Sequence, residues 1–118
     1  MKIVHVEDDA DTRAVVKDIL TGAGHKVTSI GLPKKAAAAI KKEKPKIVLL
    51  DIMMPGMSGW DVYKEIRKYD KKVHVAFLSV IEVSKEREKT LAKEGVCAYI
   101  MKPFTATELV NIVEKIDG

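Results

Sequence analysis

The stretch Ile47-Val48-Leu49-Leu50 decides the fold, because this unbroken apolar run is followed at once by a carboxylate, Asp51. A strand with one solvated face would alternate apolar and polar residues, so a continuous run indicates a strand that is covered on both faces. Sheets with two covered faces are typically parallel and lie between layers of helices. The run therefore predicts one strand of a parallel α/β sheet.

The same unit, an apolar run followed by a helical pattern, repeats along the whole chain. The expected strands are residues 3–6, 27–30, 47–50, 73–78 and 98–100, and the expected helices are residues 12–23, 33–42, 60–69, 85–94 and 105–117. Right-handed crossovers then build a doubly wound, flavodoxin-like five-stranded parallel sheet with strand order 2-1-3-4-5 and helices on both faces.

The sequence signals are strongest for the last of the expected helices and weakest for the fourth. Thr105 and Glu108 form a capping box ahead of the last one, which makes its start the clearest in the chain. The fourth is mostly charged and has few core anchors beyond Leu91 and Ala92, so we expect it to be loosely held and movable.

Length and composition indicate a single folded domain over residues 1–118. The chain is 47% hydrophobic and 32% charged, which is ordinary for a globular protein and too hydrophobic for a disordered one. No apolar run approaches the roughly 20 residues that cross a bilayer, and Met1 leads directly into a strand, so we expect a cytoplasmic protein without membrane contact. Cys97 is the only cysteine, which excludes an intrachain disulfide and predicts a small buried hydrophobe.

The formal charge of +4 raises the question of nucleic-acid binding. Six lysines crowd one stretch, at Lys34, Lys35, Lys41, Lys42, Lys44 and Lys46. They flank an alanine run on a predicted helix, without interleaved aromatic residues for base stacking. A solvated helix face explains them, and we expect no direct nucleic-acid binding.

Chemically useful side chains stand where the predicted strands end, which is where ligands bind in open α/β sheets. Glu7, Asp8 and Asp9 follow the first strand, and Asp51 follows the third. If those two strands are neighbours, the crowded like charges call for a cation between them. The ligands are hard oxygens, which favours Mg²⁺, with Mn²⁺ as the alternative, over zinc.

The ends of the last two strands supply a hydroxyl, Ser79, and an amine, Lys102. A carboxylate such as Asp51 can act as a nucleophile and form an aspartyl phosphate, while a metal neutralises the incoming phosphoryl charge. Lys102 can pair with a phosphoryl oxygen and Ser79 can donate a hydrogen bond to it. Each position alone is weak evidence, but their joint placement at four strand ends favours a site for magnesium and phosphate.

Over essentially its whole length the sequence resembles the response-regulator receiver domains of two-component signalling. The matching segments are Val6-Glu7-Asp8-Asp9, the run from Leu49 to Gly59 with Asp51 at its start, Leu78-Ser79, and Met101-Lys102-Pro103-Phe104.

The resemblance implies that Asp51 accepts a phosphoryl group from a sensor histidine kinase or a phosphotransfer protein. It implies that Glu7 and Asp8 hold Mg²⁺ with Asp51, that Met53 offers a backbone carbonyl, and that a cis peptide precedes Pro103. The chain would then be a signalling switch rather than an enzyme.

Family resemblance also implies the switch residues and the output surface. Ser79 would move toward the phosphoryl group, and Tyr99 would turn inward, the alternative being that Tyr99 is a static packing residue. An unnamed downstream protein would bind the fourth helix, fifth strand and fifth helix. The chain departs from the family pattern at Val80, where a small residue is frequent. Because Val80, Ile81 and Met53 are bulky and apolar, we expect them to hinder an attacking water and to prolong the phosphoryl state.

Three other readings remain at this point. A phosphatase that phosphorylates an aspartate needs a second aspartate two residues on, where this chain has Met53. A flavin-binding flavodoxin needs a phosphate-binding loop after the first strand, where this chain has acids. An interaction module without phosphorylation is disfavoured by the intact set of acids, Ser79 and Lys102. The sequence does not distinguish a stand-alone protein from one domain of a longer regulator.

Overall fold

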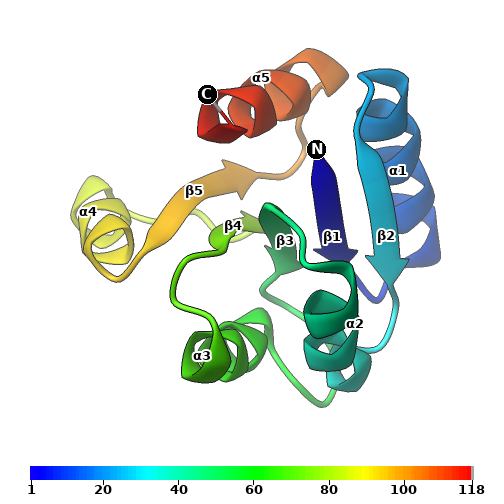
Figure 1. Ribbon diagram of the computed structural model, residues 1–118. Coiled ribbons are helices and arrows are strands. Elements are labelled where there is room, and N and C mark those ends of the chain that lie inside the picture. The colour runs from blue at the N-terminus through cyan, green and yellow to red at the C-terminus, as the bar shows by residue number, and fades with distance from the viewer. Residues whose placement is uncertain (118) are drawn as a thin grey trace.

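Five parallel strands form one sheet in the order β2-β1-β3-β4-β5 in the computed structural model, which describes residues 1–117 (Figure 1). The strands are β1 (Lys2–Val6), β2 (Lys26–Ile30), β3 (Ile47–Asp51), β4 (His74–Ser79) and β5 (Val96–Met101). Every residue of β3 is buried, as its unbroken apolar run predicts. The predicted strand order is confirmed, and Asp51 and Ser79 are the last residues of their strands rather than the first of the loops.

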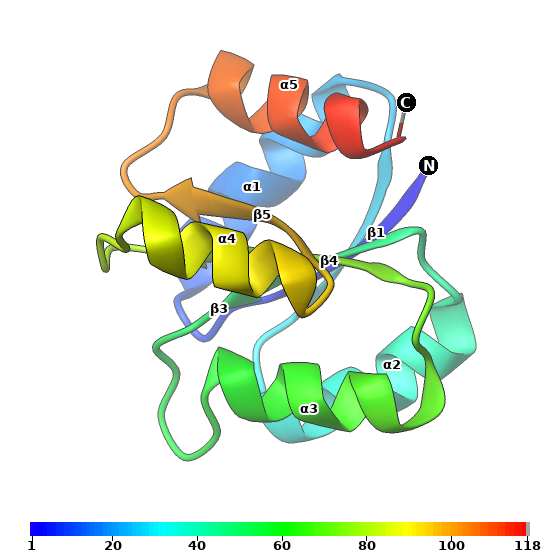
Figure 2. The same ribbon diagram turned by 90° about the vertical axis from the view of Figure 1, so that its left-hand side faces the viewer.

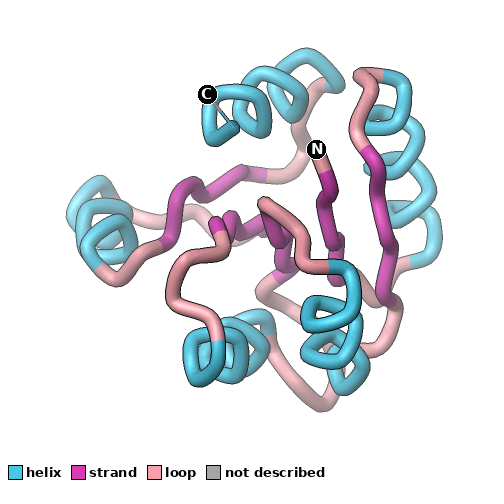
Figure 3. Tube along the Cα trace, in the orientation of Figure 1, coloured by secondary structure: helices cyan, strands magenta, loops and turns pink. Residues whose placement is uncertain are grey.

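Helices cover both faces of the sheet, also as predicted (Figure 2). They are α1 (Ala10–Gly22), α2 (Ala36–Glu43), α3 (Gly59–Tyr69), α4 (Lys85–Lys93) and α5 (Ala106–Asp117). The expected second helix is divided, because a short 3-10 turn, η1 (Pro33–Lys35), precedes α2. Each crossover between parallel strands thus contains a helix (Figure 3). Because all the strand pairs are parallel, the carboxyl ends of the five strands lie at the same end of the sheet.

The sheet divides the core into two hydrophobic layers. One layer packs α1 and α5 against the sheet, and Val16, Leu20 and Leu109 are fully buried there. The other layer packs α2 and α3, with Ile40 and Ile66 among its buried members. Successive residues of β1, such as Ile3 and Val4, enter opposite layers, which is why the strand is buried without interruption from Ile3 to Val6.

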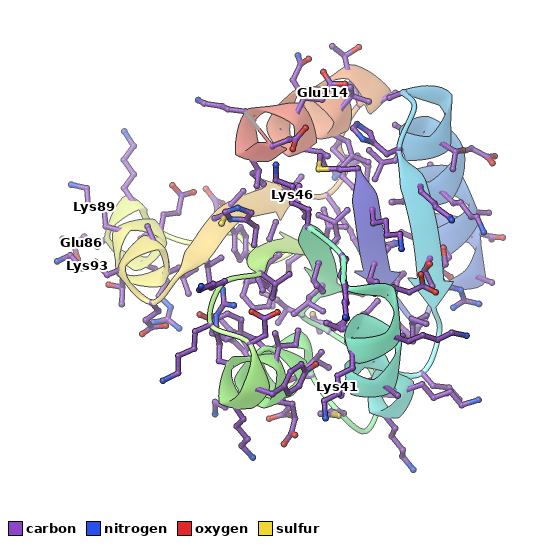
Figure 4. The ribbon with its side chains drawn as sticks, viewed as in Figure 1. Lys41, Lys46, Glu86, Lys89, Lys93 and Glu114 are labelled. Carbon is purple, nitrogen blue, oxygen red and sulfur yellow. The ribbon has the colours of Figure 1, made fainter. Side chains whose placement is uncertain are left out.

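The helix α4 is the least embedded, with Leu91 as its only buried residue. Ala92 is exposed, so its prediction as a second core anchor is wrong. Consecutive residues of a helix point in different directions, and α4 contacts the core along so narrow a stripe that Leu91 is buried and its neighbour Ala92 is not. The side chains of Glu86, Lys89 and Lys93 extend away from the sheet (Figure 4). The helix is therefore held to the core by a narrow contact.

Cys97 is exposed, which corrects its prediction as a buried residue. It lies on the edge strand β5, at the point where the pairing with β4 shifts register: Val96 pairs with Val75 and Ala98 with Ala76, so Cys97 is the extra residue of an irregularity and its side chain is left uncovered. Its sulfur lies 3.3 Å from Nδ1 of His74 on β4.

The six lysines of the basic stretch are all exposed, as expected for a solvated face. Lys41 lies over the ring of Tyr69, 4.6 Å from its centroid, and Lys46 pairs with Asp117. Both lysines are labelled in Figure 4. Within residues 1–117, no helix has both the length and the apolar character needed to span a membrane.

Candidate phosphoryl and metal site

The carboxyl ends of β1 and β3 bring Glu7, Asp8 and Asp51 together. One carboxylate oxygen from each lies within 4.8 Å of the others, as the predicted neighbouring strands require. Glu7 is 1% exposed and Asp51 is 6% exposed, whereas Asp8 is open to solvent. A cation that reached this cluster from solvent would pass Asp8 first and meet two buried carboxylates behind it.

Lys102 partly neutralises the cluster from the end of β5. Its Nζ lies 2.7 Å from Oε1 of Glu7 and 3.5 Å from Oδ2 of Asp51. The backbone N–H of Lys102 donates to the carbonyl of Ser79 at 2.8 Å, which fixes the start of its loop beside β4. The peptide bond between Lys102 and Pro103 is cis, as the resemblance implied.

The pKa values reflect this crowding. Burial raises the pKa of Glu7, the hydrogen-bonded Asp51 raises it further, and Lys102 opposes both effects. Asp8 is exposed as a residue, but partial desolvation of its carboxylate raises its pKa, and the neighbouring Glu7 carboxylate adds to the effect. Two acids with raised pKa values beside a third carboxylate form a donor set suited to a divalent cation, because hard oxygen ligands are what Mg²⁺ prefers.

Asp51 is oriented by the loop that follows it. The N–H of Met53 donates to Oδ1 of Asp51 at 3.2 Å, which leaves Oδ2 toward Lys102. The helix α3 begins close behind, since Gly59 N–H donates to the carbonyl of Ile52 at 2.9 Å. The role of the Met53 carbonyl as a metal ligand stays a prediction, while the Met53 side chain is 59% exposed at the mouth of the site.

Ser79 is fully buried at the end of β4, one strand away from Asp51. Its Oγ accepts a hydrogen bond from the N–H of Ile81 at 3.0 Å. The hydroxyl of Tyr99, on β5, donates to the carbonyl of the same Ile81 at 2.6 Å. The two predicted switch residues are thus joined through one loop residue.

Two contributors were missed by reasoning from the sequence. Arg13, on α1, donates from Nη1 to the carbonyls of both Glu7 and Asp8 at 2.8 Å. Asp9 was grouped with the acids, but its Oδ2 accepts from the N–H of Thr12 at 2.8 Å and caps α1. The only sequence signal for the helix cap was an aspartate just before a helical pattern. Nothing in the sequence indicated the contacts that Arg13 makes.

A parallel α/β sheet with this convergence of acids, hydroxyl and amine at its carboxyl edge defines a receiver-type signalling domain. The chain belongs to the family of response regulator receiver domains, whose model matches residues 3–114. It is therefore a component of two-component signal transduction, in a family whose members are typically signalling switches rather than classical enzymes.

Known proteins similar to this chain include both short and long members. It is 34% identical to chemotaxis protein CheY of Thermotoga maritima over 116 residues, covering 98% of this chain and 96% of that protein. It is 36% identical to the DNA-binding response regulator MtrA of Mycobacterium tuberculosis over 109 residues, which is 92% of this chain but only 47% of MtrA. The chain thus spans about half the length of MtrA.

Solved structures share the fold. CheY4 of Vibrio cholerae superposes with a TM-score of 0.88 at 25% identity, covering 98% of this chain and 97% of that one. The BeF3-activated receiver domain of RstA from Klebsiella pneumoniae has a TM-score of 0.85 at 27% identity, covering 98% and 97%.

Proposed function

We propose that the chain is a phosphoacceptor switch in which Asp51 takes a phosphoryl group from a sensor histidine kinase or a phosphotransfer protein. The observation that carries the proposal is the approach of three carboxylates within 4.8 Å, with Lys102 against two of them. Such a cluster combines a nucleophile, a cation site and a fixed positive charge, which are the parts that phosphoryl transfer needs.

Glu7, Asp8 and Asp51 would hold Mg²⁺ through their side chains, and Met53 through its backbone carbonyl, with Mn²⁺ as the alternative ion. When bound, the ion would neutralise charge on the carboxylates and on the incoming phosphoryl group. The raised pKa values of Glu7 and Asp8, caused first by burial and then by the neighbouring carboxylates, fit this role, since a bound cation would stabilise the charged forms of both groups.

In the transfer step, a carboxylate oxygen of Asp51 forms a bond to phosphorus as the bond to the donor imidazole nitrogen breaks. The electron pair of the broken bond stays on that nitrogen. Lys102 keeps its proton and moves from Glu7, 2.7 Å away, toward a phosphoryl oxygen. Ser79 then donates its hydroxyl hydrogen to another phosphoryl oxygen.

The switch would follow from the contacts of Ile81. When Ser79 turns toward the phosphoryl group, its bond to the Ile81 N–H draws the loop with it. The Ile81 carbonyl then leaves the Tyr99 hydroxyl, and Tyr99 turns inward. The change would reach a downstream protein at the surface of α4, β5 and α5, where α4 is weakly anchored.

The remaining parts of the proposal concern context. We propose that residues 1–118 form one receiver domain that acts in the cytoplasm. We expect its partners to be proteins, with no direct binding to nucleic acid or membrane.

Intact-mass analysis after treatment with a small phosphodonor and Mg²⁺ tests the central claim. Wild type and the Asp18→Asn control, which alters an exposed carboxylate of α1, should each gain the mass of one phosphoryl group. Asp51→Asn should gain none. Absence of labelling in wild type, or equal labelling of Asp51→Asn, would contradict the proposal.

A further inference from the structure

Arg13 contacts the acidic loop without touching its carboxylates. From the first turn of α1, its Nη1 donates to the carbonyl oxygens of Glu7 and Asp8, both at 2.8 Å. We propose that Arg13 is a positioning residue that fixes the backbone of Glu7 and Asp8, and so sets the affinity of the site for Mg²⁺. This inference rests on the proposed function of the acidic cluster.

Two further hydrogen bonds hold the loop on its other sides. The N–H of Glu7 donates to the carbonyl of Ile30 at 3.0 Å, and Asp9 is tied to α1 through Thr12. Arg13 therefore completes the hold on a segment whose carboxylates repel one another. Without that hold, repulsion could spread the acids apart, and Mg²⁺ would have to reassemble them on binding.

Gly31 supplies independent evidence that space is kept for this guanidinium. A Cβ at Gly31 would lie 2.8 Å from Nη1 of Arg13 and 3.0 Å from its Cζ. Gly31 is not one of the glycines with a positive φ, so its backbone conformation does not require glycine. Residue 31 instead lacks a side chain where the Arg13 guanidinium occupies the space that a Cβ would need.

Charge and positioning make opposite predictions for Mg²⁺ binding. The positive charge of Arg13 by itself repels a divalent cation, so its removal would tighten binding if charge were the main effect. If Arg13 positions the loop, its removal weakens binding despite the lost repulsion. The sign of the change therefore separates the two roles.

The experiment measures the dissociation constant of Mg²⁺ by titration calorimetry on the metal-free protein. Arg13→Met should weaken binding about tenfold, the lower end of what partners of metal ligands contribute. Gly31→Ala keeps the charge but displaces the guanidinium, and it should weaken binding in the same direction. The two substitutions together should add little to Arg13→Met alone, because both break the same contacts.

Arg67→Met is the matched control. Arg67 also donates to backbone carbonyls, of Val73 at 2.8 Å and of Gly95 at 3.1 Å. These carbonyls directly precede β4 and β5, at the amino ends of the strands and away from the acidic cluster. Its loss should lower the melting temperature and leave Mg²⁺ affinity within about twofold of wild type.

Unchanged or tighter Mg²⁺ binding by folded Arg13→Met would overturn the inference. If Arg13→Met does not fold, as judged by circular dichroism, unchanged binding by Gly31→Ala would overturn it instead. If the wild-type protein bound no Mg²⁺, the proposed function itself would be contradicted, and this result is distinct from a failure of the inference about Arg13.

Discussion

The hydroxyl of Tyr99 donates a 2.6 Å hydrogen bond to the carbonyl of Ile81, and thereby links β5 to the loop that follows Ser79. The N–H of Ile81 donates in turn to Ser79 Oγ at 3.0 Å. A displacement of the buried serine that carried Ile81 with it would therefore stretch or break the contact to Tyr99. This chain of bonds connects the edge of the acidic site with the surface of α4 and β5.

Tyr99→Phe should loosen that loop without unfolding the protein. The lost bond is exposed, so we expect a cost of about 0.5–1 kcal/mol in the free energy of unfolding. Amide hydrogen exchange in residues 80–84 should become faster, because the loop loses one of its anchors. Hydrogen-exchange mass spectrometry on the unphosphorylated protein measures this.

Tyr69→Phe is the control for the tyrosine substitution. Its hydroxyl lies 3.4 Å from the carbonyl of Ala37, which is far along the chain from residues 80–84. It should leave exchange in residues 80–84 unchanged. Equal exchange in Tyr99→Phe and wild type would show that the bond to Ile81 does not hold the loop.

Glu7→Gln should stabilise the metal-free protein near neutral pH. The folded-state pKa of Glu7 is raised, first by burial and then by Asp51, so the folded state binds the proton more tightly than the unfolded state. The free energy of unfolding therefore falls as pH rises through that raised pKa. Removing the charge should recover about 1 kcal/mol, or about 4 °C in melting temperature.

Thermal melts from pH 4 to pH 8, with and without Mg²⁺, check the sign. The gain from Glu7→Gln should vanish at the acid end, where wild-type Glu7 is already protonated. Mg²⁺ should raise the melting temperature of wild type more than that of the variant, which has lost a ligand. A variant less stable than wild type at pH 7 without Mg²⁺ would mean that the pair with Lys102 outweighs burial.

The placement of the acids could be predicted from sequence because it needs only the strand ends. The apolar run before Asp51 and the one before Glu7 mark two strands, and a parallel sheet brings their carboxyl ends to one edge. The strand ends do not predict that the Lys102 ammonium lies nearer to the Glu7 carboxylate than to the Asp51 carboxylate. This preference depends on side-chain reach across three strands, which no local pattern encodes.

The same distinction explains the other misses. Arg13 acts on backbone carbonyls, and a helix pattern does not show where a long side chain will end. Cys97 was expected to be buried from its residue type, but its exposure is decided by the position of β5 at the sheet edge. Tertiary placement, rather than local preference, fixes each of these.

Gly59→Ala should disturb the acceptor strand directly. An added Cβ would lie 2.3 Å from the backbone oxygen of Asp51 and 2.9 Å from Cα of Ile52. Backbone atoms cannot rotate away as a side-chain tip can, so α3 or the end of β3 must shift. We expect a loss of about 2 kcal/mol or more in the free energy of unfolding, and slower phosphorylation of Asp51.

Urea unfolding and the rate of labelling by a small phosphodonor measure the two effects of Gly59→Ala. Gly22→Ala is the matched control, because a Cβ there meets nothing within 4 Å and Gly22 lies in α1. That control should be as stable as wild type or slightly more stable. Wild-type stability in Gly59→Ala would show that α3 can retreat from β3 at little cost.

The apolar side chains at the mouth of the site should prolong the phosphorylated state. Met53 is 59% exposed, Val80 is 63% exposed and Ile81 is 43% exposed, and Met53 and Ile81 bond through their N–H groups to Asp51 and Ser79. Because the loops that carry these side chains begin at Asp51 and Ser79, we expect the side chains to flank the path of a water toward an aspartyl phosphate and to offer that water no hydrogen bond. Hydrolysis should therefore be slow.

The double variant Met53→Ala, Ile81→Ala should shorten the half-life of the phosphorylated protein by about tenfold, equivalent to about 1.4 kcal/mol of barrier. It keeps every backbone group of the site, so labelling itself should persist. Intact-mass analysis after removal of the phosphodonor follows the decay. Leu32→Ala, which trims a side chain that is 56% exposed in the loop after β2, should leave the half-life unchanged. A half-life equal to wild type in the double variant would exclude shielding by these residues, because water would then reach the phosphoryl group equally well without them.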